Sequence, residues 1–177
     1  MLDGEIDITT RATLGESSAF GLLYNHYQPK IYRFVYLKVG HREEAEDLTH
    51  QVFLHAWAHI GTYTPQGFPF GAWLYRIARN AVIDHYRTKK EHTSLEDLIE
   101  GPPIHSEPLT KLHSKLELEK IKKLIPKLKQ DYQDVILMRF VEDMSIKEAA
   151  SALDKSEGAI KLIQHRAINA LKKLLTG

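Results

Sequence analysis

The sequence predicts an all-α protein with two small helical domains joined by a flexible linker, the C-terminal domain containing a helix-turn-helix. Apolar residues recur at helical spacing through most of the chain, whereas alternating β-branched runs bounded by turn residues are lacking. The helical pattern stops over residues 91–110, which contain three prolines, one glycine and an acidic excess. A connection of roughly twenty residues is long for a compact domain. We therefore expect domains at 1–92 and 112–177, with the linker over 93–111.

The composition is that of an ordinary globular protein. The chain has 177 residues, of which 43% are hydrophobic and 27% charged, so a packed core is expected. It contains no cysteine, which excludes disulfide scaffolds, thiolate metal sites and cysteine nucleophiles. The acidic first ten residues lack the basic and apolar run of a signal peptide, and no window approaches the ~18 uncharged apolar residues of a membrane span. A cytoplasmic protein without membrane insertion is expected.

The net charge of +1 hides an uneven distribution. Residues 1–92 carry ten basic and ten acidic side chains, residues 93–114 carry one and four, and residues 115–177 carry thirteen and nine. The basic excess lies wholly in the C-terminal third. That is where an electrostatic footprint for nucleic acid would stand, although a solvated lysine-rich surface would look the same.

Three helices are expected in the N-terminal domain, over residues 18–39, 43–60 and 70–87, each with an apolar face at helical spacing. Pro29 is expected either to kink the first of these helices or to begin a second one. Residues 61–69 contain two glycines and two prolines in nine positions. They are therefore predicted to form a loop.

The C-terminal domain is predicted to have helices over residues 111–125, 130–141, 145–153 and 156–175. Ser145 and Glu148 fit a capping box at the start of the third helix. Asp154 and Lys155 form a short turn to the longer fourth helix, which Ser156 caps, and this arrangement is a helix-turn-helix. An ordinary helical hairpin with a solvated face is the alternative. Long polar side chains that can reach bases and phosphates stand on the outward face of the fourth helix: Glu157, Lys161, Gln164, His165 and Lys172.

An aromatic and basic segment over residues 67–87 suits single-stranded nucleic acid. Basic side chains can follow the strand's backbone, and rings or pockets can receive unstacked bases. Tyr63 and Phe68 lie in the loop, so a purely core role is harder to assign to them than to Trp73. One stripe of the helix is expected to be exposed and carries Arg76, Asn80, Asp84 and Arg87, with Arg79 and His85 beside it.

The helix over residues 43–60 shows a second polar stripe, formed by Asp47, Gln51 and His55 at steps of four. This stripe is interpreted either as a docking surface or as a merely solvated face, which is the commoner role of exposed charge. His55 and His59 lie one turn apart, but no carboxylate stands between them and no further ligand is apparent. No metal site is therefore predicted.

Three segments of the chain, in this order, resemble the extracytoplasmic-function (ECF) sigma factors of bacterial RNA polymerase. They are EEAEDLTHQVFLHAW, FGAWLYRIARNAVIDHYR and LIPKLKQDYQDVILMRFVEDMSIKEAASALDKSEGAIKLIQHRA. Three dispersed motifs in the right order are far more specific than a lone helix-turn-helix. One departure is Asp154, which stands where the family usually has a turn glycine. Since Asp tolerates a left-handed conformation, the turn is still expected to form.

The resemblance implies a protein without catalysis that binds core RNA polymerase and promoter DNA, with an anti-sigma factor as a further partner. The N-terminal domain would dock on the polymerase clamp coiled coil through Glu44, Asp47, Leu48, Gln51 and His55. It would melt and read the −10 element through Tyr63, Phe68, Arg76, Arg79, Asn80, Asp84, His85 and Arg87. The C-terminal domain would sit on the polymerase flap and read the −35 element through Ser156, Glu157, Ala159, Lys161, Gln164, His165, Arg166 and Lys172. The linker would thread through the core enzyme.

Two other classes of function compete with this one. A stand-alone regulator would bind an operator through the helix-turn-helix and use its N-terminal domain as a sensor or for dimerisation. Such a domain would not need the loop and helix over residues 61–87. An enzyme has little support, because the chain has no Gly-rich phosphate loop, no HExxH and no nucleophile signature. No cofactor is expected.

Overall fold

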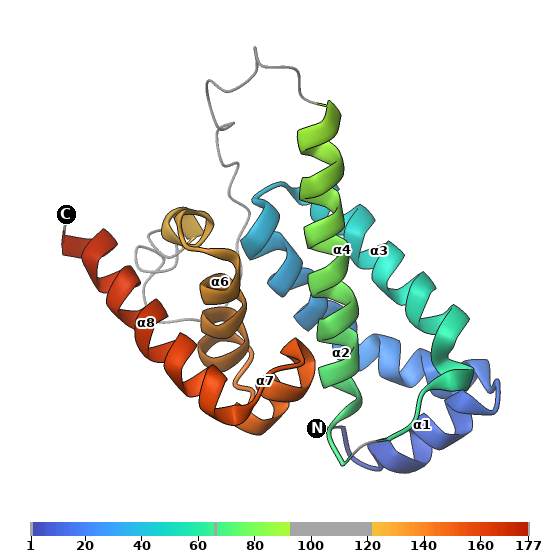
Figure 1. Ribbon diagram of the computed structural model, residues 1–177. Helices are drawn as coiled ribbons and strands as arrows, with labels where there is room; N and C mark the ends of the chain where they lie inside the picture. Colours follow the sequence, from blue (N-terminus) through green and yellow to red (C-terminus); the bar gives the residue numbers. More distant parts are fainter. Residues whose placement is uncertain (1, 66, 93–121, 177) are drawn as a thin grey trace.

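The computed structural model describes residues 2–65, 67–92 and 122–176, and all regular structure in these ranges is helical (Figure 1). The N-terminal domain contains α1 (Glu5–Thr13), α2 (Ser17–Val39), α3 (Arg42–His59), a 3₁₀ turn (Ile60–Thr62) and α4 (Phe70–His92). The C-terminal domain contains a 3₁₀ turn (Ile125–Lys127), α6 (Gln130–Ile136), its π-helical continuation (Leu137–Val141), α7 (Ile146–Leu153) and α8 (Glu157–Thr176). The prediction of two all-α domains is confirmed. The linker predicted over 93–111 lies outside the described residues, as does most of the helix predicted over 111–125.

Helix α1 was not predicted from the sequence. The positions that it buries are occupied by Glu5, Thr9 and Ala12, so it lacks the apolar period that reveals an amphipathic helix. Ile6, by contrast, points outward and is 74% exposed. Packing against α2 and against the 3₁₀ turn holds the helix, with Ala12 and Ile8 as its apolar contacts with the core.

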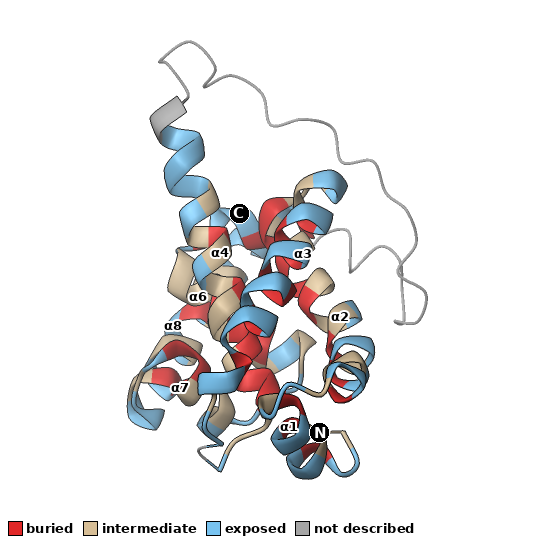
Figure 2. Ribbon diagram, turned by 90° about the vertical axis from the view of Figure 1, so that its right-hand side faces the viewer, coloured by how far each residue is buried: buried red, intermediate tan, exposed pale blue. Residues whose placement is uncertain are grey.

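The core of the N-terminal domain is formed where α2, α3 and α4 pack together. Leu23, Phe34, Val52 and Leu74 are at most 1% exposed, and each such side chain contributes roughly 1.5–3 kcal/mol by burial. Figure 2 shows the buried positions on the facing sides of these helices. Helix α2 continues through Pro29 without a break, so no second helix begins there.

The C-terminal domain contains the predicted helix-turn-helix, formed by α7 and α8. The capping box is present, because Ser145 Oγ accepts from Glu148 N while the Glu148 carboxylate accepts from Ser145 N. Asp154 adopts the left-handed conformation with φ of 53°, so the turn forms without the glycine. Ser156 Oγ accepts from Ala159 N at 3.1 Å and caps α8 as predicted.

The two domains lie against each other, with α7 packed on α4 (Figure 1). We call this contact the interdomain surface. It joins Arg33, Lys38, Tyr75, Arg76 and Arg79 of the N-terminal domain to Asp131, Asp134, Glu142 and Ser151 of the C-terminal domain. These ion pairs and hydrogen bonds connect positions far apart in the sequence, and buried apolar residues of both domains belong to the same core cluster.

Candidate nucleic-acid interface

The loop before α4 and the first turns of α4 enclose a pocket of about 220 Å³. Tyr63 and Phe68 line it from the loop, and Trp73 and Arg76 line it from the helix. Ser151, on α7 of the other domain, completes the wall. The pocket is therefore lined by aromatic rings, by the Arg76 cation and by a residue of the neighbouring domain.

The two loop aromatics are half-buried, not fully exposed as a free base platform would be. The ring of Tyr63 lies 5.3 Å from that of Phe70 and 5.0 Å from that of Trp73, between centroids. Burial raises the pKa of the Tyr63 phenol above its ordinary value. Phe68 has Lys147 of the C-terminal domain over its ring, at 5.6 Å from the centroid. Both rings thus combine a packing role with a position on the pocket.

The stripe predicted along α4 is only partly exposed, which corrects the sequence prediction. Asn80, Asp84 and Arg87 are exposed, and Arg87 pairs with Asp84 at 3.3 Å. Arg76 is half-buried because its guanidinium donates to the backbone oxygen of Ser151. Its Nε is buried and has no hydrogen-bond partner among the described residues. The sequence could not show that a second domain covers this end of the stripe.

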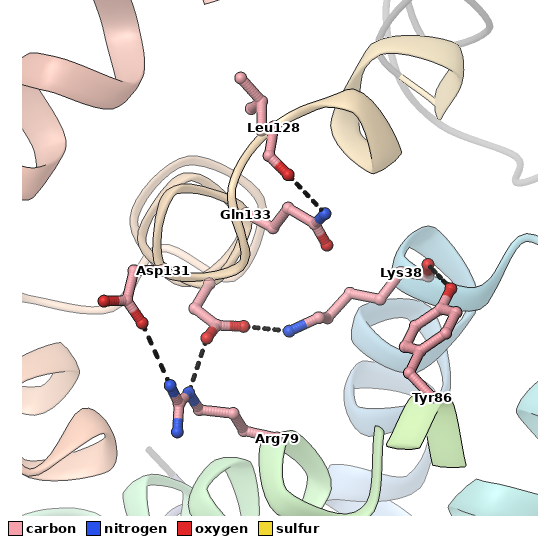
Figure 3. A network of polar contacts seen from close by, with 7 residues as sticks. Lys38, Arg79, Tyr86, Leu128, Asp131 and Gln133 are labelled. Atoms are coloured by element: carbon pink, nitrogen blue, oxygen red, sulfur yellow. Dashed lines mark hydrogen bonds and ion pairs between the residues drawn. The ribbon is translucent and has the colours of Figure 1, made fainter. Parts of the chain in front are cut away.

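Arg79 is also turned toward the C-terminal domain, where it takes part in a polar network with Asp131 and Asp134 (Figure 3). Its Nε donates to Asp134 Oδ2 at 2.6 Å, and a second nitrogen donates to Asp131 at 3.1 Å. The other oxygen of Asp134 accepts from the ammonium of Lys38. The side chains of Lys38 and Asp134 are fully buried. Burial lowers the pKa of the Lys38 ammonium, and the Asp134 carboxylate opposes that shift.

A second interdomain group is centred on Glu142, whose side chain is 1% exposed. Arg33 donates two hydrogen bonds of 2.8 Å to its two carboxylate oxygens, a bidentate geometry. The hydroxyl of Tyr75 donates to the same carboxylate at 2.7 Å. Burial, followed by the Glu142 charge, raises the pKa of the Tyr75 phenol. Both buried carboxylates of this surface are therefore fully engaged.

A groove of about 560 Å³ between α3 and α4 contains residues that were predicted for two different roles. Gln51 and His55, predicted for polymerase docking, face Asn80, Asp84 and His85, predicted for the −10 element. Leu48 also lines the groove but is 5% exposed and belongs mainly to the core. Asp47 is exposed on the adjoining surface.

Glu44 ties the two walls of this groove together. Its carboxylate contacts His85 at 3.1 Å and Lys89 at 3.0 Å, both on α4. Burial acts to raise the pKa of Glu44, but the hydrogen bond and charge of Lys89, together with His85, lower it below its ordinary value. Glu44 thus joins α3 to α4 and is less available for docking than the sequence suggested.

The outward face of α8 is largely as predicted. Glu157, Lys161, His165, Arg166 and Lys172 are exposed, and Ser156 is exposed at the cap. Ala159 and Gln164 are half-buried. The side-chain oxygen of Gln164 accepts from Arg139 Nε at 3.1 Å, so this residue is partly committed to its own domain.

Neither a metal site nor a membrane span is found in the described part of the chain. Residues 2–65, 67–92 and 122–176 contain no group of three or more His, Cys, Asp or Glu that could hold a metal ion. The rings of His55 and His59 stack at 4.2 Å, and His59 Nδ1 lies 2.9 Å from the backbone oxygen of His55. No helix of the described residues is long and apolar enough to cross a membrane.

The fold and the pocket together define a two-domain helical protein with a helix-turn-helix, and comparison with known proteins identifies its family. Residues 23–92 match the model of sigma-70 region 2, and residues 118–171 match the model of sigma-70 region 4. The sequence is 36% identical over 172 residues to the ECF RNA polymerase sigma factor BldN of Streptomyces coelicolor, covering 96% of this chain and 65% of BldN. It is 33% identical over 172 residues to SigW of Bacillus subtilis, covering 91% of each chain.

Two solved structures share this fold. CnrH, in complex with the cytosolic domain of CnrY, has a TM-score of 0.75 and 24% identity, covering 97% of each chain. The sigma factor RpoE of Bartonella quintana, in complex with the anti-sigma factor NepR, has a TM-score of 0.75 and 25% identity, covering 89% of this chain and 96% of RpoE.

The chain belongs to the ECF sigma factors, non-enzymatic proteins that direct promoter-specific transcription initiation by RNA polymerase. The resemblance stated from the sequence is confirmed, and the stand-alone regulator and the enzyme are set aside.

Proposed function

We propose that the two domains, over residues 1–92 and 112–177, read the two promoter elements separately, with residues 93–111 as the linker. The pocket between the loop and α4 receives an extruded base of the −10 element, and α8 reads the −35 element. Core polymerase holds both domains at the spacing of the two elements. Each weak DNA contact then gains from the effective concentration that the other contact creates.

The observation that carries the −10 assignment is the pocket of about 220 Å³ at the loop. Its aromatic rings offer stacking partners to a base, and Arg76 brings a buried Nε that has no partner within the described residues. Buried donors are nearly always satisfied in folded proteins, so such a donor on a pocket wall fits an acceptor supplied by a ligand. Capture of a base there would offset the few kcal/mol that unstacking costs.

The −35 assignment is supported by the exposed polar face of α8. Lys161 and His165 follow at a step of four on this face, near the end of the helix that Ser156 caps. In helix-turn-helix proteins the first turns of the second helix meet base edges in the major groove. Lys172, further along α8, is placed to contact phosphate.

Transcription by purified core polymerase on a promoter library, with and without the chain, tests the proposed division. The unmodified chain is expected to select templates that share a −35 and a −10 element. Lys161→Ala should weaken selection at the −35 positions only, because a good base contact contributes ~1–3 kcal/mol. Lys173→Ala removes another exposed cation of α8, outside the proposed set, and serves as the control. Unchanged −35 selection in Lys161→Ala would show that α8 presents another face.

Docking on core polymerase is assigned to the exposed stripe of α3, with Asp47 at its centre. Asp47→Arg is expected to abolish co-purification with core polymerase, because it reverses a charge at the proposed contact. A substitution at an exposed site such as Asp47 rarely changes the free energy of unfolding by more than ~0.5 kcal/mol, so the melting temperature should stay the same. Glu46→Arg makes the same charge change on the adjacent face and should bind core normally. Full core binding by Asp47→Arg would refute the docking assignment.

An anti-sigma factor is proposed as a further partner. RpoE of Bartonella quintana, 25% identical to this chain, is seen bound to the anti-sigma factor NepR. Because the two domains lie against each other, residues of both domains form one surface to which such a regulator can bind. Since core polymerase works on chromosomal DNA, we place the chain in the cytoplasm.

A further inference from the structure

The carboxylate of Glu5 connects the start of α1 to the start of α4. Glu5 is 5% exposed, and its side chain accepts three hydrogen bonds. Oε1 accepts from the backbone N–H of Phe70 at 2.7 Å. Oε2 accepts from the hydroxyl of Tyr27 at 2.7 Å and from the backbone N–H of Leu2 at 3.0 Å. An N-terminal side chain thus reaches a backbone atom 65 positions away.

Phe70 is the first residue of α4 and the point where the loop of the pocket ends. The first N–H groups of a helix have no partner within the helix, and an anion at this end also interacts favourably with the helix dipole. Glu5 therefore acts as a cap supplied by a distant segment. The ring of Phe70 in turn packs against Tyr63 and Trp73, both of which line the pocket.

Gly71 shows how closely this junction is packed. A Cβ atom at Gly71 would lie 2.6 Å from Cε1 of Tyr27, a contact that side chains essentially never make. The Tyr27 ring therefore lies directly on the backbone of the first turn of α4, with its hydroxyl fixed by Glu5. Burial, followed by the hydrogen bond to Glu5, raises the pKa of this phenol, which keeps its proton available to donate.

We propose that Glu5 is a positioning residue for strand opening: through Phe70 N and the Tyr27 hydroxyl, it holds the aromatic loop residues Tyr63 and Phe68 in the arrangement that receives the extruded −10 base. This inference rests on the function proposed for the pocket. It gives α1 a task in promoter melting, although α1 carries none of the residues predicted to touch DNA.

The test compares Glu5→Ala with Asp7→Ala in holoenzyme assembled from the full chain and core polymerase. Asp7 lies on the same helix and has the same charge, but its side chain is 75% exposed and pairs only loosely with Arg11 at 3.6 Å. Open-complex formation is read by permanganate reactivity of unpaired thymines, and core binding is measured on the same samples. Glu5→Ala should lower opening at least about tenfold, because hydrogen bonds to charged groups are among the stronger ones. Asp7→Ala should match the unmodified chain.

Two conservative variants separate positioning from a general loss of folding. Glu5→Gln keeps an oxygen that can accept from Phe70 N, but its amide nitrogen cannot accept from the Tyr27 hydroxyl or from Leu2 N, so it should restore part of the opening that Glu5→Ala loses. Tyr27→Phe removes only one of the three hydrogen bonds and should lower opening less than Glu5→Gln does. In all variants core binding and −35 selection should be unchanged. Equal opening in Glu5→Ala and Asp7→Ala would overturn the inference, as would a loss of core binding by the same factor as opening.

Failure of the pocket assignment itself gives a different pattern. If Tyr63→Ala with Phe68→Ala leaves opening intact, the proposed function of the pocket falls. If that pair blocks opening while Glu5→Ala does not, only the role of Glu5 falls.

Discussion

Asp134→Ala is expected to separate the two domains. Asp134 is the common acceptor for Lys38 and Arg79, and the side chains of Lys38 and Asp134 are fully buried. Removing one partner of a buried ion pair typically costs ~3–5 kcal/mol, because the remaining charge is left without compensation. In this protein Lys38 can regain water if the C-terminal domain moves away. We therefore expect domain opening before unfolding of either domain.

The absence of cysteine makes this result simple to measure. Cysteines placed at two exposed positions, His50 on α3 and Lys173 on α8, can carry a donor and an acceptor dye. Energy transfer should fall in Asp134→Ala and stay high in Asp131→Ala. Asp131 belongs to the same network but is 44% exposed, and exposed ion pairs contribute only ~0–1 kcal/mol. Transfer in Asp134→Ala as high as in the unmodified chain would show that Asp134 does not hold the domains together.

The triple variant Tyr63→Ala, Phe68→Ala, Asn80→Ala is expected to block open-complex formation while core binding persists. Stacking of a base on an aromatic ring contributes ~1–3 kcal/mol, so loss of two rings should lower opening by roughly a hundredfold. Permanganate footprinting of the holoenzyme measures this directly. The unmodified protein should also prefer the non-template strand, with an affinity that falls as salt rises.

Tyr63 also packs on Phe70, so the control must carry a comparable loss of aromatic packing elsewhere. Tyr24→Ala removes a ring of α2 that is 40% exposed and packs against Phe53 of α3. The Tyr24→Ala variant should open promoters normally. Normal opening by the triple variant would remove the pocket from the account of melting, and failure of the unmodified chain to open any promoter would contradict the mechanism as a whole.

Most of the fold could be predicted because apolar periodicity and capping residues are local signals. The bounds of α2, α3, α7 and α8 agree with the predicted ranges to within a residue or two. Helix α1 could not be predicted in this way, because its buried face has Glu5 and Thr9 in place of apolar side chains. The sequence does place Glu5 in an acidic segment, but nothing local indicates that its carboxylate reaches Phe70.

The exposure of several proposed site residues could be predicted, but their surroundings could not. Asn80 and Lys161 are exposed as expected, since helical spacing alone decides that. Arg76 and Arg79 are covered, because domain contacts depend on packing between segments that share no local pattern. Lys38 gave a weak signal, standing within the apolar run VYLKV, but its partner Asp134 lies 96 positions away.

The engagement of Arg79 has a consequence for how tightly the isolated chain can hold DNA. Because its guanidinium is bound to Asp131 and Asp134, in the proposed role it contacts a nucleic acid only after the C-terminal domain moves away, so the apparent dissociation constant is the intrinsic one divided by the open fraction. Every 1.4 kcal/mol in favour of closure weakens DNA binding about tenfold. A partner that binds the separated domains removes this loss of DNA affinity. A partner that binds the closed arrangement makes the loss larger. The equilibrium between the closed and the open arrangement of the domains would then by itself keep the chain from binding DNA away from the polymerase.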